Sequence, residues 1–179
     1  MPTSSFTFTT TAGQTIDREL LIAYLNTGTS TTPVWSALGT RVEDSSQEYD
    51  WQEETITDIL GVKRSTMKKP TITQTFDPSK LDSADTALKH IWDLAVKDQD
   101  YSALAAQDML IVHLYASDGQ TTPGFFAERY SACMVKASSL GGEGGGDIAM
   151  PIDVTYGGTR TTGTATRTSA GVVTFTAAT

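Results

Sequence analysis

Helical spacing occurs in only one segment of this 179-residue chain, and this restricts the fold more than any other feature of the sequence. Between about residues 83 and 98, apolar side chains recur at i, i+3, i+4 and i+7, as in an amphipathic helix: Leu88, Ile91, Trp92 and Ala95. Asp82 or Ser83 can cap its first turn. The rest of the chain must therefore be built from strands and loops.

The other patterned segments are typical of strands. We expect them at residues 19–26, 34–38, 47–55, 71–76, 109–116, 125–138 and 147–156, followed by a C-terminal hairpin that turns at 169–171. The nearly continuous apolar run at 109–116 predicts a central strand buried on both faces. Asp77-Pro78 is expected to end the fourth strand, and Pro151 to mark an edge or a bulge. In the segment 147–156, inward-pointing side chains alternate with outward ones: Ile148, Met150, Ile152, Val154 and Tyr156.

Threonine is unusually frequent, with 30 residues, and it is concentrated at both ends of the chain. Because threonine is β-branched, it favours extended, half-buried positions. Together with the single helix, this predicts a mainly β fold, an antiparallel β-sandwich or barrel with one flanking α-helix at about 83–98. Residues 1–18 are either a frayed tail or an extended N-terminal arm, and 19–179 form one domain.

Charge and rare residue types exclude several functions. Thirteen basic residues against 21 acidic ones give a formal net charge of −8, which argues against a surface that grips nucleic-acid phosphates. A single cysteine, Cys133, permits no internal disulfide, and two histidines leave too few ligands for a Cys/His zinc site. No run of 18 apolar residues occurs, so we expect a soluble protein made in a reducing cytoplasm.

Motifs for catalysis are not found. The glycine cluster at 141–146 lacks the Lys-Ser/Thr of a phosphate loop, and the segment from Asp98 lacks the sixth-position glycine of a calcium loop. His90, His113 and Cys133 are expected to be partly or fully buried structural residues. The sequence therefore predicts a protein that is not an enzyme and that has no cofactor, no metal site and no catalytic residues.

A charge reversal lies within a long charged loop at about 41–70. Residues 41–58 contain seven acidic side chains and one basic one, whereas four cations follow closely: Lys63, Arg64, Lys68 and Lys69. In the strand at 47–55, Tyr49 and Trp51 are expected to pack on one face, while the other face is acidic through Glu48, Asp50 and Glu54. This loop is either a solvated hairpin or a projection whose basic end meets an acidic patch on another copy.

The order of these features resembles a known family. The segments that carry the resemblance are ELLIAYL at 19–25, a short strand with Trp35, EYDW at 48–51, KPTITQTFDP at 69–78 and SLGGEGGGDIAMPIDVTYGG at 139–158. Over residues 19–175 the chain resembles the major tail tube protein of long-tailed, siphovirus-type bacteriophages that infect Gram-positive bacteria. That family is also similar in fold to the tube subunit of the type VI secretion system.

The resemblance implies a structural virion protein, assembled in the host cytoplasm and located in the tail. Six copies would form a ring, and rings would stack around a tape-measure protein, next to tail terminator and distal tail proteins. Genomic DNA would pass through without specific binding, and no membrane is involved. We then expect acidic side chains on the lumen wall (Glu48, Asp50, Glu54, Asp153), contacts between rings (Lys63, Arg64, Lys68, Lys69) and contacts of the N-terminal arm with an adjacent subunit (Phe6, Phe8).

Three alternatives remain open. A carbohydrate-binding or adhesion sandwich would be a stable monomer with an exposed aromatic platform. A tail terminator or decoration protein of the same virion would stop at one ring or bind a lattice. An enzyme would require a pocket in which His113, Glu128 or Asp153 converge, which the spacing of these residues does not predict.

Overall fold

Two long antiparallel strands, β9 (Gln107–Ser117) and β10 (Phe125–Ala137), form the centre of the fold. The structure is a computed structural model that describes residues 5–120 and 122–178. Val112 pairs with Ala127, and most of β9 is buried. The apolar run at 109–116 is therefore a central strand, as the sequence predicted, because neighbours cover both of its faces.

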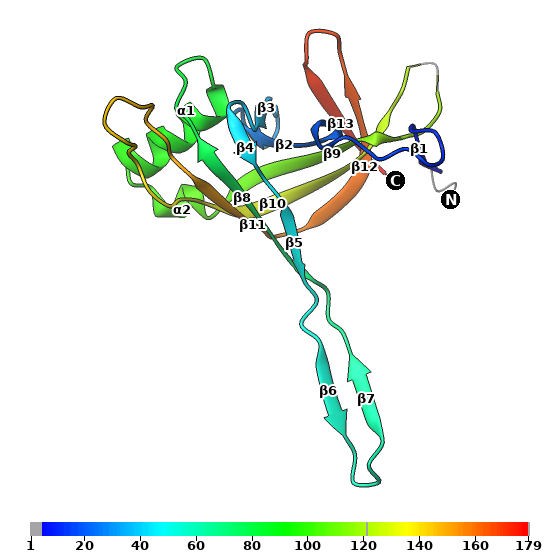
Figure 1. The fold of residues 1–179 in the computed structure, drawn as a ribbon. Coiled ribbons are helices and arrows are strands. Elements are labelled where there is room, and N and C mark those ends of the chain that lie inside the picture. The colour runs from blue at the N-terminus through cyan, green and yellow to red at the C-terminus, as the bar shows by residue number, and fades with distance from the viewer. Residues whose placement is uncertain (1–4, 121, 179) are drawn as a thin grey trace.

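One antiparallel sheet curls around this pair (Figure 1). Beyond β9 lie β2 (Leu21–Asn26) and β3 (Trp35–Leu38), and beyond the first half of β10 lie β12 (Arg160–Arg167) and β13 (Val173–Ala177). The second half of β10 pairs with β11 (Ile152–Tyr156), which leads to β8 (Thr71–Ser79), β4 (Val42–Asp44) and β5 (Gln47–Asp50). The result is a mainly β half-barrel with one short helix of 12 residues, which confirms the predicted fold class.

The helical segment consists of α1 (Thr86–Trp92) and the π-helical turn η2 (Asp93–Lys97), followed by the single turn α2 (Tyr101–Leu104). Asp85 caps α1 by accepting a hydrogen bond from the Leu88 N–H at 2.9 Å. The expected cap at Asp82 or Ser83 was wrong, because the Asp82 carboxylate instead accepts from the Ala84 N–H and pairs with Arg41. Lys89 and Lys97 both contact Asp93, at 2.7 Å and 3.9 Å, so these charged residues of the helical segment pair with one another.

The core lies on both sides of β9. Leu25, Ile111 and Val154 belong to the larger cluster, which α1 covers through Leu88 and Ile91. The smaller cluster occupies the opposite face of the sheet; it contains Tyr24, Trp35, Leu110, Val112, Ala127, Ala165 and Val173. Alternate residues of β9 enter alternate clusters, as expected for a strand with two buried faces.

A two-stranded hairpin leaves this body and extends far from it (Figure 1). Its strands are β6 (Glu54–Thr57) and β7 (Lys63–Thr66), of four residues each, and all of their residues are exposed. Residues 42–50 pair with β8 instead, so the projecting part of the charged loop is confined to about residues 51–70.

Three further local expectations were wrong. Strand β8 continues through Asp77-Pro78 to Ser79, because β4 pairs with it there and the Ser79 carbonyl accepts from Met150. Ile148 is exposed, since the regular ladder of β11 begins only after Pro151. The third concerns the aromatic pair Tyr49 and Trp51, described below. Among the described residues, no helix is long and apolar enough to cross a membrane.

Candidate assembly surfaces

The tip of the β6–β7 hairpin exposes apolar side chains. Ile59 is fully exposed and Leu60 is 83% exposed, and Ile56, Val62 and Met67 along the hairpin are more than half or about half exposed. Fully burying an Ile or Leu side chain is worth about 1.5–3 kcal/mol. A hairpin that leaves these side chains in water therefore has an apolar surface suited to contact with another molecule.

The turn at this tip has a defined shape. The Asp58 carboxylate accepts hydrogen bonds from the Leu60 and Val62 N–H groups, each at 2.9 Å, and Gly61 has a φ of +79°. The Asp58 N–H also donates to the Val62 carbonyl at 3.0 Å. These hydrogen bonds define the backbone of the turn, and the side chains of Ile59 and Leu60 are exposed on it.

The four predicted contact cations do not form one cluster. Lys63 and Arg64 lie in β7 near the tip, where Arg64 is 3.7 Å from the Asp58 carboxylate. Lys68 and Lys69 lie near the body, where the Lys68 N–H donates to the Trp51 carbonyl. The structure therefore divides them into a pair at the tip and a pair at the base of the hairpin.

Three of the four acidic residues predicted for the lumen share one outer face of the sheet. Glu48 lies opposite Thr73 in β5 and β8, and Asp153 lies opposite Thr75 in β11 and β8. Asp50 points to the same side as Glu48, because the two are separated by one residue in a strand. Glu54 is separate from them, since it lies in β6 on the projecting hairpin.

Asp153 is held in place on this face. It accepts hydrogen bonds from Ser138 and from Thr75, and the Lys136 ammonium lies 3.2 Å away. The Ser138 hydrogen bond is the main cause of a lowered pKa for the Asp153 carboxyl, which partial burial opposes and Lys136 supports. The carboxylate is therefore ionised at neutral pH, although Lys136 offsets part of its charge.

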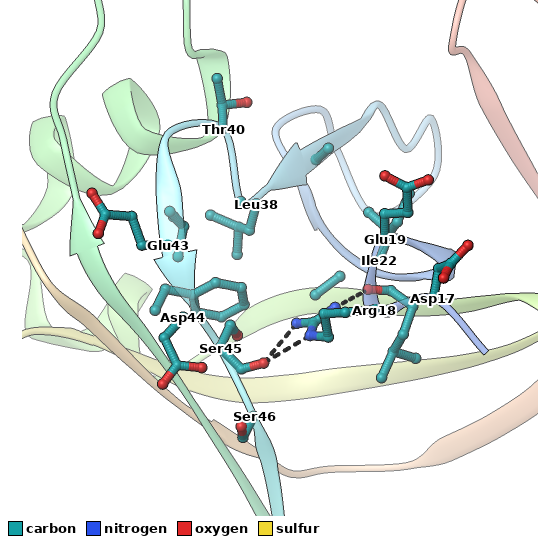
Figure 2. Close-up of a pocket in the computed structure, with 16 residues that line it drawn as sticks. Asp17, Arg18, Glu19, Ile22, Leu38, Thr40, Glu43, Asp44, Ser45 and Ser46 are labelled. Atoms are coloured by element: carbon teal, nitrogen blue, oxygen red, sulfur yellow. Dashed lines mark hydrogen bonds between the residues drawn. The ribbon is translucent and has the colours of Figure 1, made fainter. Parts of the chain in front are cut away.

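A pocket of about 790 Å³ opens between the 3-10 turn η1 (Arg18–Leu20), β3 and β4 (Figure 2). Its apolar lining includes Leu21, Ile22, Leu38, Val42 and Phe76. Four carboxylates also line it, with Asp17 and Glu19 on one side and Glu43 and Asp44 on the other (Figure 2). The pocket thus combines an apolar interior with an acidic rim.

Arg18 links two chain segments that form the wall of this pocket. The Arg18 guanidinium donates to the Ser45 carbonyl from Nε at 2.9 Å and from Nη2 at 2.8 Å, and to the Leu21 carbonyl at 2.6 Å (Figure 2). These bonds connect η1 to the segment between β4 and β5. The pocket is therefore formed within the single chain, before any partner binds.

A buried polar group surrounds Glu128. Its Oε1 is 3.2 Å from His113 Nε2, and its Oε2 accepts from Tyr130 at 2.8 Å and from Arg160 Nε at 2.7 Å. Burial raises the pKa of this carboxyl, but the hydrogen bonds from His113, Arg160 and Tyr130 together outweigh burial and lower the pKa to about 2. The spacing of His113 and Glu128 did not predict that they meet; the pairing of β9 with β10 brings them together. Asp153 is not part of this group.

This arrangement is suited to holding strands together rather than to proton transfer. Both oxygens of Glu128 are occupied, and a carboxylate with a pKa of about 2 is a poor general base near neutral pH. His113 Nδ1 is also engaged, 2.7 Å from the Tyr115 hydroxyl. Among the described residues, no group of three or more His, Cys, Asp or Glu side chains is placed to hold a metal ion.

Tyr49 and Trp51 lie at the base of the hairpin. Their rings stack with centroids 6.5 Å apart, and each residue is 46% exposed, so the expectation that this face of the strand packs was wrong. The physical reason is that β5 is an edge strand and Trp51 lies beyond its end. They line a second pocket of about 410 Å³, which also contains Glu128, Arg160 and Lys69.

The N-terminal segment contacts its own chain. Strand β1 (Thr7–Phe8) pairs with the end of β9, Phe6 lies edge-on to Phe126, and Phe8 lies edge-on to Tyr115 with ring centroids 5.4 Å apart. Residues 1–4 of the predicted arm lie outside the described residues. The contact of Phe6 and Phe8 with an adjacent subunit stays a prediction.

Several strands lie at free margins of the curled sheet. In residues 5–120 and 122–178, β3 pairs only with β2, β13 pairs only with β12, and β4 and β5 each pair only with β8. Unpaired N–H and C=O groups on such an edge can pair with another chain. The free edges and the hairpin tip are the surfaces of this chain most suited to self-association.

The fold has counterparts among solved structures of injection machines. A chain in the sheath/tube terminator of the extracellular contractile injection system PVC, in its extended state, matches with a TM-score of 0.53 and 10% identity, over 85% of this chain and 99% of that chain. A chain of the PVC sheath-tube complex in the extended state gives 0.48 at 10% identity, over 93% and 95%. A chain of the anti-feeding prophage cap, a tube-terminating cap, gives 0.46 at 12% identity, over 94% and 95%.

At these identities the likeness defines the fold alone: it is a tail tube-like fold. No family model matches the sequence, and no curated protein matches it either.

Sequence reasoning missed the acidic pocket and the Glu128 group. Asp17 and Glu19 are 24 or more residues from Glu43 and Asp44 in the sequence, and only the sheet brings them to one opening. The alternation of β10 could have placed Glu128 and Tyr130 on one face, but Arg160 joins them through the pairing of β10 with β12.

Proposed function

We propose that this chain is a structural subunit of a tail tube, from a phage tail or a phage-like injection machine, that assembles with identical copies. The observation that carries the proposal is the β6–β7 hairpin, which projects from the body with Ile59 and Leu60 exposed at its tip. A two-stranded hairpin alone is only marginally stable in water, and it becomes well ordered when a partner covers it. The tail tube-like fold supports the same assignment.

Pairing of edge strands between copies would close a ring. Edge strands β3 and β13 lie at opposite margins of one sheet, so a β13 edge of one copy can pair with a β3 edge of the next. Such pairing joins separate half-barrels into a continuous closed wall. Six copies per ring is the number that the family resemblance implies, and stacked rings give a tube that encloses a tape-measure protein and later conducts DNA.

The acidic face suits the wall of such a conduit. Glu48, Asp50 and Asp153 lie on one side of three adjacent strands, among exposed and half-exposed threonines. Carboxylates repel phosphates over a Debye length of about 8 Å at physiological salt, so DNA would pass without binding. In this proposal these three residues face the bore, whereas Glu54 lies on the hairpin and serves the contact between copies.

Two other candidates each have one supporting observation. The likeness to a chain of a sheath/tube terminator favours a terminator, which would stop at one ring instead of extending a tube. The half-exposed Tyr49–Trp51 stack beside a pocket favours a carbohydrate-binding sandwich, since sugars stack on aromatic rings. A terminator forms single rings and a carbohydrate-binding domain stays monomeric, so the state of association separates all three.

The test uses the tip of the hairpin. We expect the double variant Ile59→Asp/Leu60→Asp to remain folded and monomeric at concentrations where the unaltered protein forms rings or filaments in negative-stain micrographs. The two charges would have to enter an apolar contact, which costs several kcal/mol per unpaired charge. Circular dichroism and thermal unfolding check that the body is intact.

The matched control is Tyr101→Asp. Tyr101 is also strongly exposed, at 85%, but it lies in α2 on the body. This variant should assemble like the unaltered protein. Equal assembly of the tip variant and the control would remove the hairpin from the contact between copies and, with it, the observation that carries the proposed function.

A further inference from the structure

We propose that the hairpin tip of one copy binds in the pocket between η1, β3 and β4 of the next copy. This inference rests on the proposed function, because it names the contact by which identical copies associate. The tip offers Ile59 and Leu60 on a hydrogen-bonded turn, and the pocket offers an interior of about 790 Å³ with apolar side chains. A tip of two aliphatic side chains fits a space of this size, since ligand pockets of about 300–1,000 Å³ enclose drug-sized molecules.

The charges of the two surfaces are complementary. Four carboxylates and one guanidinium line the pocket, and the guanidinium of Arg18 already bonds to two backbone carbonyls. Lys63 follows the apolar tip and makes no ion pair with a described side chain, while Arg64 is only 3.7 Å from Asp58. An apolar tip followed by cations therefore meets an apolar interior with an acidic rim. This complementarity favours rapid association of the two copies and fixes how the tip is aligned in the pocket.

Two other cavities fit the tip less well. The pocket at Tyr49 and Trp51 is about half as large, and its charged lining residues are Lys69, Arg160 and a Glu128 that is fully paired, so it does not attract cations. Another pocket, of about 300 Å³, is acidic through Asp44, Glu48 and Asp77 but has no large apolar side chain in its lining. Of these three pockets, the one beside η1 combines an apolar interior with an acidic rim.

The contact joins two copies rather than two parts of one chain. The tip lies at the far end of the hairpin, away from the β2–β3–β4 region where the pocket opens (Figure 1). Every copy then carries one tip and one pocket at opposite ends. A head-to-tail contact of this kind closes into a ring or continues as a filament, depending on the rotation between neighbours.

Disulfide trapping tests the pairing. Leu60→Cys places a thiol on the tip, and Thr40→Cys places one among the exposed residues that line the pocket. When the two variants are mixed and mildly oxidised, we expect interchain dimers at a level at least about tenfold above that of either variant alone, because a bound tip presents its thiol at a high effective concentration. The native Cys133 is fully buried and does not compete.

The matched control pairs Leu60→Cys with Thr71→Cys, which is exposed and lines the pocket at Tyr49 and Trp51. Dimers with Thr40→Cys and not with Thr71→Cys support the inference. If copies assemble but the tip thiol does not react with Thr40→Cys, the inference is wrong while the proposed function stands. If the unaltered protein does not assemble and no dimers form, both are wrong.

Discussion

Glu128 shows how a single residue stabilises the centre of this fold. It is a buried carboxylate that accepts from groups of β9, β10 and β12 at once: His113, Tyr130 and Arg160. Burial alone would raise the pKa of the carboxyl, yet the three donors lower it to about 2. The charged form is therefore strongly favoured in the folded state, and it joins three strands that the sequence separates by up to 47 residues.

The first prediction concerns acid stability. The pKa of the Glu128 carboxyl is about 4.5 when unfolded and about 2 when folded, so its contribution is complete above pH 4.5 and is lost as the pH falls towards 2. In Glu128→Gln, the decrease in the free energy of unfolding between pH 5 and pH 2.5 should be smaller, by up to about 3 kcal/mol. Urea unfolding at several pH values measures this.

The control for this prediction is Glu143→Gln, at an exposed carboxylate in the glycine-rich loop. It should keep the pH dependence of the unaltered protein. If the free energy of unfolding fell with pH equally in Glu128→Gln and in the unaltered protein, the three donors would not hold the carboxylate in its charged form.

The second prediction concerns Cys133, which is fully buried in β10. Burial raises the pKa of its thiol to about 12, with backbone hydrogen bonds opposing the shift. Since the thiolate is the reactive form, Cys133 should not react with a thiol reagent at pH 8 in the folded protein and should react completely in denaturant. An engineered Leu60→Cys thiol should react at once; rapid labelling of native Cys133 would contradict the packing described for β10.

At the scale of elements, the sequence predicts local pattern well and long-range pairing poorly. The strand at 109–116 was recognisable because its apolar run has no polar face, and the helix because of its spacing. The end of β8 was not, because the partners that continue it past Pro78 are β4 and the Met150 N–H, which lie far away in the chain. The acidic pocket and the Glu128 group are products of the same long-range pairing.

The hairpin is the element most independent of the body. Both of its strands are exposed along their whole length, so they contribute little to the core. The third prediction is that replacing residues 54–66 with a short Asn-Gly turn changes the free energy of unfolding of the monomer by no more than about 0.5 kcal/mol, as for exposed surface changes. Urea unfolding checks this, and assembly should be lost.

The control for the hairpin replacement is the same replacement by a short Asn-Gly turn at the β12–β13 hairpin, where Val173 belongs to the core. That change should lower stability measurably. A large loss of stability on removing β6–β7 would mean that the hairpin supports the body, and its role in assembly would then need a different explanation.

At the scale of the whole molecule, apolar and charged surfaces are separated in space. The tip carries exposed Ile59 and Leu60 followed by cations, the pocket beside η1 has an acidic rim, and a face with Glu48, Asp50 and Asp153 lies on the sheet. The sequence contains the charge reversal and left two interpretations open, a solvated hairpin or a projection that contacts another copy, and it could not predict which surface the hairpin would meet. The pocket emerges only when η1, β3 and β4 come together.

The central claim is that the monomer folds on its own and that its hairpin tip and the pocket beside η1 are covered only when identical copies associate. Sedimentation velocity of the purified protein over about a hundredfold range of concentration tests it most directly, because head-to-tail association by mass action must grow with concentration. The account predicts a shift from monomers to large species, seen as rings or tubes by electron microscopy. A single monomeric boundary at every concentration, with Ile59 and Leu60 remaining in water, would contradict it.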